Sequence, residues 1–247
     1  MIYITGDTHG DFRRFSEDIF PEQKEMTKDD YVLILGDFGY WDKSNHGEYW
    51  RKWLDDRPFT TLWIDGNHEN YDLLKKLPIE EWHGGKVQYI EPSIIHLMRG
   101  EIYDLDGLKC VAFGGARSHD VQEGILELDD PNFIMKKKEL DERNASYRIN
   151  HLTWWKEEMP NKEEMDYLLH NLEKNDNKVD FIFTHEGPYK VMNRMYPGFI
   201  DKYELNSFFD QLSEIIDFKV WLFGHHHEDG IVDNKYVVLY EQIVALT

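Results

Sequence analysis

Short runs of apolar, β-branched and aromatic residues recur along the chain and constrain its fold more than any other feature. They lie at residues 2–5, 31–35, 61–64, 110–113, 179–183 and 220–223. Most are continuously apolar, which is typical of strands buried on both faces of a sheet. Segments with helical spacing of apolar residues separate them, near 11–19, 47–55, 70–77, 133–142, 160–174 and 202–216. Strands that alternate with helices predict an α/β fold.

Two further segments predict antiparallel hairpins. A polar turn at 233–234 separates two strand-like runs within 230–240. A further run, from Ile94 to Leu105, leads through Asp106-Gly107 into the strand at 110–113. Hairpins of this kind pair neighbouring strands in opposite directions. We therefore expect a mixed rather than a purely parallel sheet.

The composition excludes several classes of protein. The chain has 247 residues, of which 41% are hydrophobic, and domains of this size bury roughly 70–75% of the unfolded surface, which excludes disorder as the main state. The chain contains no run of about 18 apolar residues, the length that a membrane-spanning helix requires. Its first residues lack the pattern of a signal peptide. We expect a cytoplasmic protein. The single cysteine, Cys110, excludes an internal disulfide and a Cys-rich zinc site, and we expect it to be a buried strand residue.

The net charge bears on the partners of the protein, and one irregular stretch bears on its domain organisation. A net charge of −20 argues against long nucleic acid and anionic membranes as partners. The stretch from about 116 to 160 is the least regular part of the sequence. We expect one domain over residues 1–247, in which this stretch is an insertion that lies over the end of the sheet and shapes the substrate site.

Residues that can bind a divalent metal directly follow five of the apolar runs. They are Asp7 and His9, then Asp37, then Asn67 with His68 and Glu69 beside it, then His185, and finally His225 and His227. Ligands of α/β sheets bind outside the carboxyl ends of the strands, so five such ends from one sheet would converge on a small volume. A glycine precedes every cluster except that of His185, and we expect these glycines to let the backbone turn sharply. Each motif alone is compatible with a simple turn, but the ordered set predicts a shared metal site.

The ligand types indicate the kind of metal. Asp, His and Asn without Cys suit Mn²⁺, Fe²⁺ and Zn²⁺. Two carboxylates, one amide and four histidines are more than one ion needs, and they fit a pair of ions about 3.5–4 Å apart. We expect two divalent metal ions, with Mn²⁺ as the first choice and Fe²⁺ or Zn²⁺ as alternatives. The middle histidine of the last cluster, His226, should point away from the ligands.

In order, these motifs resemble the signature of the calcineurin-like metallophosphoesterase superfamily, and most of all its small single-domain bacterial and phage members. The matching motifs are Asp7-x-His9, Gly36-Asp37, Gly66-Asn-His-Glu69, His185 and Gly224-His-x-His227. The resemblance implies a four-layer α/β/β/α sandwich with two mixed β-sheets. It also implies that one ion is held by Asp7, His9, Asp37 and His227 and the other by Asp37, Asn67, His185 and His225, with Asp37 bridging.

The resemblance further implies hydrolysis of a phosphate ester. Hydroxide from a water that bridges the ions would attack phosphorus. His68 would lie beside the metals without being a ligand, and would protonate the leaving group or bind a phosphoryl oxygen. Asp65 and Glu69 are candidates to orient the ring of His68.

The resemblance to the protein Ser/Thr phosphatases of this superfamily is incomplete. Their phosphate-clamping arginines, just after the second motif and just before the third, are absent from residues 36–41 and 63–67. Tyr40 and Trp41 offer an aromatic rim for a base or an aryl group, or pack in the core. Arg117 and His119 are further candidates for contacts with substrate.

Three functional hypotheses follow from these features. We favour a phosphomonoesterase whose substrate is a small phosphate ester or a phosphorylated protein. The alternatives are a phosphodiesterase or nuclease that acts on small or cyclic nucleotides, and an inactive binding scaffold on the same fold. A panel of aryl phosphomonoesters and phosphodiesters with Mn²⁺ separates the three.

Overall fold

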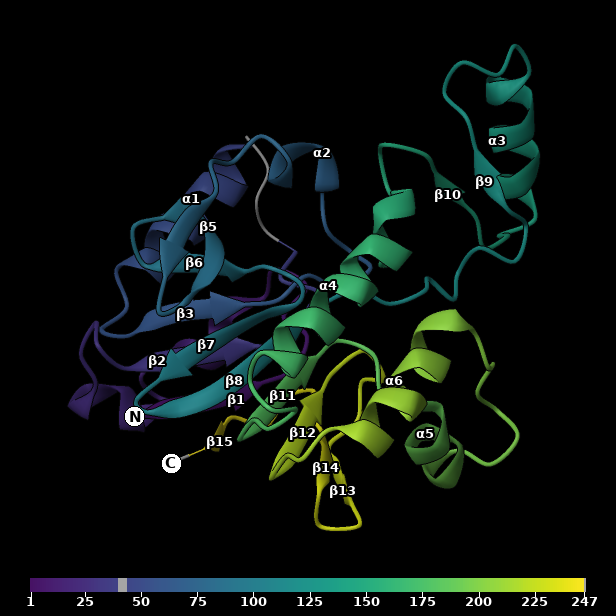
Figure 1. The fold of residues 1–247 in the computed structure, drawn as a ribbon. Helices are drawn as coiled ribbons and strands as arrows, with labels where there is room; N and C mark the ends of the chain where they lie inside the picture. Colours follow the sequence, from purple (N-terminus) through teal and green to yellow (C-terminus); the bar gives the residue numbers. More distant parts are fainter. Residues whose placement is uncertain (40–43, 247) are drawn as a thin grey trace.

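The apolar runs form two mixed β-sheets that pack face to face in the computed structural model, which describes residues 1–39 and 44–246 (Figure 1). The first sheet has seven strands in the order β15-β1-β2-β3-β6-β5-β4. Its strands are β1 (Ile2–Thr5), β2 (Tyr31–Ile34), β3 (Thr60–Trp63), β4 (Glu80–Trp82), β5 (Gly85–Glu91), β6 (Ile94–Leu97) and β15 (Val244–Ala245). Strands β1, β2, β3 and β6 are parallel, and the remaining pairings are antiparallel.

The second sheet has six strands in the order β13-β14-β12-β11-β8-β7. Its strands are β7 (Glu101–Leu105), β8 (Leu108–Phe113), β11 (Phe181–Thr184), β12 (Val220–Phe223), β13 (Gly230–Val232) and β14 (Tyr236–Val238). The predicted hairpins β7–β8 and β13–β14 are both antiparallel. Strands β8, β11, β12 and β14 run parallel, so this sheet is mixed as well.

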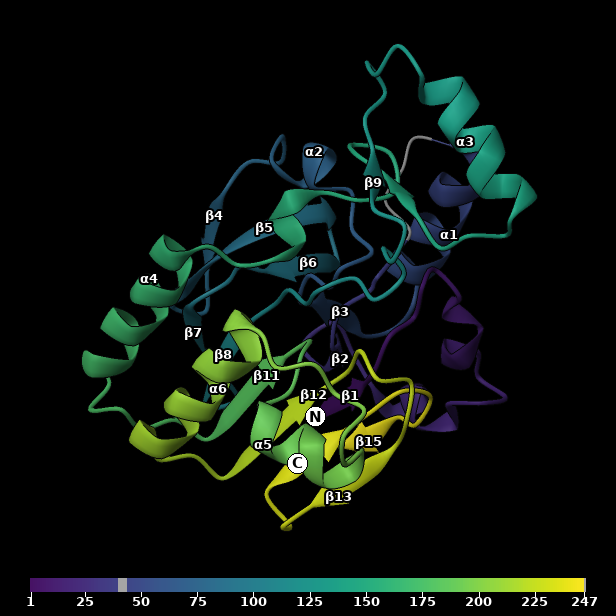
Figure 2. The same cartoon turned by 90° about the vertical axis from the view of Figure 1, so that its right-hand side faces the viewer.

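Helices cover the outer face of each sheet and complete four layers (Figure 2). The seven-stranded sheet packs against α1 (Asn45–Asp55), α2 (Tyr71–Leu74) and two 3-10 helices (Phe12–Phe15 and Pro21–Glu25). The six-stranded sheet packs against α4 (Lys162–Glu173), α5 (Tyr189–Met195) and α6 (Glu204–Ile215). Fully buried residues such as Leu62, Cys110 and Phe183 fill the space between the sheets. The predicted four-layer α/β/β/α sandwich is confirmed. Among the described residues, no helix has the length and apolar character that a membrane span requires.

Residues 116–160 contain a small unit of their own. It consists of β9 (Ile125–Leu126), α3 (Phe133–Glu142) and β10 (Arg148–Ile149), and β9 pairs in parallel with β10. Leu126, Leu140 and Ile149 form a separate small core. This unit stands apart from the two sheets in both views (Figures 1 and 2). A short 3-10 helix (Lys156–Glu158) then leads back toward α4. That this stretch shapes the substrate site stays a prediction.

Three predicted elements differ in the structure. The expected helix over 70–77 is only the single turn α2, Tyr71–Leu74. The expected helix over 11–19 is only the 3-10 helix Phe12–Phe15, whose two buried phenylalanines are three residues apart, the spacing at which 3-10 side chains align. The run 94–105 is not one strand but two, β6 and β7, which belong to different sheets. Gly100 lies between them with a φ of 81°, a left-handed conformation that suits glycine and lets the chain cross from one sheet to the other.

Candidate metal centre

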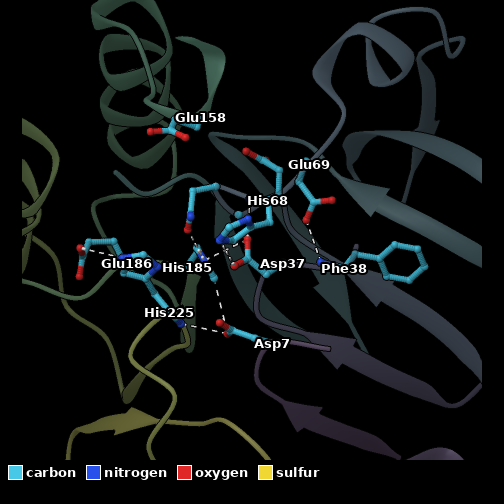
Figure 3. A network of polar contacts seen from close by, with 12 residues as sticks. Asp7, Asp37, Phe38, His68, Glu69, Glu158, His185, Glu186 and His225 are labelled. Atoms are coloured by element: carbon cyan, nitrogen blue, oxygen red, sulfur yellow. Dashed lines mark hydrogen bonds and ion pairs between the residues drawn. The ribbon is translucent and has the colours of Figure 1, made fainter. Parts of the chain in front are cut away.

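The predicted ligands lie where five strands end, but these strands belong to two sheets rather than one. β1, β2 and β3 come from the seven-stranded sheet, and β11 and β12 from the six-stranded sheet. The sequence-based expectation of a single sheet was therefore wrong. The centre lies between the ends of two facing sheets, and Figure 3 shows Asp7, Asp37, His185 and His225 close together there.

One cluster of candidate ligands contains Asp7, His9 and His227, whose ligand atoms lie within 4.8 Å of one another. The Nε2 atoms of His9 and His227 are 2.9 Å apart. His227 Nε2 lies 3.3 Å from Asp7 Oδ2. This Oδ2 atom is buried and has no hydrogen-bond donor among the described residues. A buried carboxylate oxygen without a donor, faced by two imidazole nitrogens, fits a divalent cation.

The second cluster is centred on His185, which is fully buried. Its Nδ1 lies 2.6 Å from the carbonyl oxygen of Leu35 and donates to it. This hydrogen bond leaves Nε2 as the ligand atom, an arrangement common to metal-binding histidines. Nε2 lies 3.4 Å from Asp37 Oδ1 and 3.2 Å from Asn67 Oδ1.

His225 comes from the six-stranded sheet and lies beside Asp7 and His185. Its backbone N–H donates to Asp7 Oδ1 at 2.9 Å, and its ring lies 5.0 Å from that of His185, centre to centre. Burial lowers the pKa of His225 to about 3. The imidazole is therefore neutral at physiological pH, which is the form that binds metals.

Several of these residues have strained backbone conformations. Positive φ angles occur at His9 (46°), Asp37 (46°), His225 (70°) and His227 (51°). Non-glycine residues adopt this region rarely, and the strain is of the order of 1–3 kcal/mol for each. Strain of this kind gathers at functional sites, where the rest of the fold holds it in place.

The glycines before the clusters serve a different purpose from the one expected. Gly36 has a positive φ of 95°, but Gly6, Gly66 and Gly224 do not, so a sharp turn is not their common requirement. Instead, a Cβ atom at Gly66 would lie 2.1 Å from Asp37 Oδ1, and one at Gly36 would lie 2.1 Å from His185 Nδ1. These glycines leave room for the ligands of neighbouring strands.

The two buried carboxylates are ionised. Burial by itself would raise the pKa of Asp37, but the charge of His185 and their hydrogen bond hold it below its ordinary value. Burial likewise opposes the charge on Asp7, and the charge of His185 lowers the pKa of that carboxyl. In turn, burial would lower the pKa of His185, but Asp37 and Asp7 raise it to about 10. In the metal-free centre, His185 is therefore protonated and offsets part of the charge of the two carboxylates. A divalent cation bound at Nε2 would take the place of this proton, because metal binding releases the protons of its ligands.

His68 lies beside these clusters. Its backbone N–H donates to Asp37 Oδ1 at 2.8 Å, and its Nε2 is 3.9 Å from Asp37 Oδ2. Burial lowers the pKa of its imidazole, while the charge of Asp37 opposes that shift. Nη2 of Arg148 lies 3.1 Å from Nδ1 and 3.4 Å from Nε2 of this ring. Sequence reasoning missed Arg148 because it lies in the irregular stretch 116–160, where no motif marks it.

Neither carboxylate proposed to orient His68 does so. Asp65 is buried and accepts a hydrogen bond of 2.8 Å from Nε of Arg99. Glu69 accepts one of 2.8 Å from the backbone N–H of Phe38, as Figure 3 shows. Both expectations were wrong, because the two side chains satisfy groups in the surrounding loops.

Two further residues that sequence reasoning missed hold the amide of Asn67. Asn67 Nδ2 donates to Ser118 Oγ at 3.4 Å, and this hydroxyl donates to Glu158 Oε2 at 2.6 Å. The backbone N–H of Ser118 donates to the other oxygen of Glu158 at 2.9 Å. These contacts turn Asn67 Oδ1 toward His185. Only the fold brings residues 67, 118 and 158 together.

The remaining predicted residues lie in different surroundings. His226 points away from the clusters and lies 2.8 Å from Glu186 Oε1, as expected. His119 lies next to the centre, with its Nε2 2.9 Å from that of His225. The side chain of Arg117 is exposed. Tyr40 and Trp41 fall outside the described residues. Contacts of Tyr40, Arg117 and His119 with substrate stay predictions.

Two cavities lie near the centre. One of about 240 Å³ adjoins His68 and is lined by Gly39, His68, Glu69, Asn70, Arg148, Leu152, Thr153 and Trp155. A larger one, of about 950 Å³, lies behind Asp65 between α4 and β5, and none of the candidate ligands lines it. The smaller cavity is the one placed to receive a group that reacts at the metal ligands.

Similarity to known proteins agrees with the geometry. Lariat debranching enzyme A of Xenopus laevis is 27% identical over 145 residues, which cover 51% of this chain and 26% of that protein. Lariat debranching enzyme of Danio rerio is 26% identical over 148 residues, which cover 53% of this chain and 25% of that protein. The matched part is about a quarter of the length of these relatives. A family profile described as calcineurin-like phosphoesterase matches residues 1–229. The chain therefore belongs to the calcineurin-like phosphoesterase family, as its ordered motifs predicted.

Proposed function

We propose that this protein is a phosphoesterase that works with two divalent metal ions, and that Asp37 is shared between them. The observation that carries this proposal is the position of the Asp37 carboxylate between the two clusters. Its Oδ1 lies 3.4 Å from His185 Nε2, and its Oδ2 lies 3.8 Å from His9 Nε2. One carboxylate therefore reaches a ligand nitrogen on each side.

Asp7 also lies near both clusters, but its contact with His185 is of another kind. Its Oδ1 is 3.9 Å from Nδ1 of His185, the nitrogen that donates to the Leu35 carbonyl. Nδ1 is therefore not a ligand atom, and Asp7 faces a ligand nitrogen only on the side of His9 and His227. This difference supports Asp37 rather than Asp7 as the bridge.

The ligand set also supports a choice of metal. Oxygen and imidazole ligands without sulfur suit Mn²⁺, our first choice, with Fe²⁺ or Zn²⁺ as alternatives. Two such cations, when bound, supply a nucleophile from water near neutral pH and neutralise the charge of the phosphate. The protein's own contribution is to fix the ligands through strained turns, exclude bulk water from His185, and place the ring of His68 where it meets the phosphate or the leaving group.

For the substrate, we propose a small phosphate ester, with a monoester as the first candidate. The small cavity beside His68 and the net charge of −20 favour a compact substrate over long nucleic acid. A diester is the second candidate, because the chain is similar to enzymes named for the debranching of lariats. A phosphorylated protein remains an alternative source of a monoester.

An aryl phosphomonoester and the matching aryl phosphodiester test this proposal. Chelator-treated protein should lose hydrolysis of both compounds, and Mn²⁺ should restore it, with faster turnover of the monoester. Faster turnover of the diester would make phosphodiesters, rather than phosphomonoesters, the proposed substrate class. Full hydrolysis by metal-free protein, or none by Mn²⁺-loaded folded protein on either compound, would contradict a metal-dependent phosphoesterase.

A further inference from the structure

Arg148 brings a positive charge to the candidate centre from outside the family motifs. It opens β10 in the small unit formed by residues 116–160. Its Nη2 reaches the ring of His68, at 3.1 Å from Nδ1. Since His68 lies directly against Asp37, the guanidinium is separated from the shared carboxylate by one imidazole ring.

The guanidinium is held in place by its neighbours. Its Nε donates to Asp120 Oδ1 at 2.8 Å, and its Nη2 lies 2.5 Å from Asp120 Oδ2. Its Nη1 donates to the carbonyl of Thr153 at 3.2 Å. Only 17% of the side chain is exposed. A positioned guanidinium loses little freedom when it binds a ligand, which favours affinity.

The same side chain lines the cavity of about 240 Å³ together with His68. Two other arginines near the centre, Arg14 and Arg99, are engaged elsewhere. Arg14 donates to the backbone carbonyls of Asp7 and Tyr240, and Arg99 binds Asp65 on the far side of the third ligand loop. Among the lining residues of this cavity, Arg148 is the one that carries a permanent positive charge.

We propose that Arg148 binds an oxygen of the substrate's phosphate group in the cavity beside His68. The inference rests on the proposed phosphoesterase function and adds a residue to it. Asp120 and the carbonyl of Thr153 take Nε, Nη1 and one hydrogen of Nη2, so the donor for the phosphate oxygen is the second N–H of Nη2, which faces the ring of His68. Hydrogen bonds from a charged donor to phosphate are about twice as strong as those between neutral groups. The unit at 116–160 thereby supplies the arginine that the segments around the second and third motifs lack.

Inorganic phosphate, the product common to any phosphomonoester, is the probe for this contact. Mn²⁺-loaded Arg148→Gln should bind phosphate about 10–100-fold more weakly than the unaltered protein, the range typical of a lost hydrogen bond to a charged group. Arg148→Lys should recover part of the loss. Arg143→Gln is the matched control, since Arg143 lies in the same unit but pairs with Glu123 at the surface. Calorimetry measures binding, and elemental analysis checks the metal content of each variant.

A second set of variants separates direct contact from an effect exerted through His68. In a His68→Asn background, Arg148→Gln should still weaken phosphate binding at least about 10-fold. An effect that vanishes in that background would make Arg148 a positioning residue and overturn the proposal. Unchanged phosphate affinity in Arg148→Gln, or loss of metal from it, would also overturn it. Phosphate binding that depends on Arg148 in a protein that hydrolyses no ester would retain this contact and reject the proposed function.

Discussion

At the scale of single residues, the centre depends on side chains that do not themselves bind metal. Ser118 and Glu158 are both buried, and together they hold the amide of Asn67. An amide can present either its oxygen or its nitrogen, and only the oxygen is a metal ligand. The hydroxyl of Ser118 receives the amide N–H and thereby fixes the oxygen on the side of His185.

Ser118→Ala should therefore weaken one metal site and spare the other. Loss of a residue that orients a ligand typically costs about 10–100-fold in metal affinity. The loss should fall on the ion held by Asn67 and His185, and calorimetric titration with Mn²⁺ should resolve it. Ser213→Ala is a suitable control, because the Ser213 hydroxyl donates to the carbonyl of Asp210 in α6 and takes no part in the candidate centre. Equal weakening of both ions, or of neither, would show that Ser118 does not orient Asn67.

At the scale of secondary-structure elements, one buried ion pair joins three parts of the fold. Arg99 lies in the connection between β6 and β7 and bonds to Asp65, which follows β3. It also contacts Glu164 in the first turn of α4, at 3.2 Å. The side chains of Arg99 and Asp65 are 7% and 2% exposed. The pair thus ties the third ligand loop to the strand crossover and to the helix layer.

Arg99→Met should lower the free energy of unfolding by about 3–5 kcal/mol, because it leaves the carboxylate of Asp65 buried without its cation. Arg143→Met removes an exposed pair and should cost no more than about 1 kcal/mol. Urea unfolding followed by tryptophan fluorescence compares the two variants under the same conditions. Equal stabilities for both variants would mean that water or other donors satisfy Asp65.

The sequence predicts the elements well where one physical requirement dominates. Strands such as β2 and β11 are continuously apolar because both of their faces are covered, so the pattern marks them directly. The break at Gly100 was not predicted, although Arg99, Gly100 and Glu101 interrupt the apolar residues at the point where the chain changes sheet. The short hairpin of β4 and β5 was not predicted either, because β4 is largely exposed and lacks an apolar pattern.

The residues of the candidate site also fall into those that the sequence marks and those that it does not. Residues next to strand ends, from Asp7 to His227, could be found from sequence because their position along the chain fixes their place in the fold. Arg148, Ser118 and Glu158 could not, because their roles depend on how the irregular stretch 116–160 folds back onto the ligand loops. Asp65 and Glu69 show the opposite kind of error. Their position next to His68 in the sequence suggested that they orient its ring, but their hydrogen bonds go to Arg99 and to the backbone of Phe38.

At the scale of the whole molecule, the centre is a consequence of two sheets packed face to face. Asp7, Asp37 and Asn67 arrive from one sheet, and His185 and His225 from the other. Neither sheet alone carries a complete set, so the candidate ligands come together only when the sandwich closes. In the proposed two-metal centre, metal binding and folding would be coupled, and we expect added Mn²⁺ to stabilise the native state.

The metal content of the purified protein tests the central claim most directly. Elemental analysis after equilibration with Mn²⁺ and removal of free ion should give two ions per chain. His185→Ala should lose mainly the ion held by Asn67 and His185. Asp37→Asn should weaken the binding of both ions, because it removes the shared carboxylate. Ser213→Ala should match the unaltered protein, and circular dichroism should verify that every variant is folded. Two tightly held ions in Asp37→Asn, or no more than one in the folded unaltered protein, would contradict a two-metal centre built around Asp37.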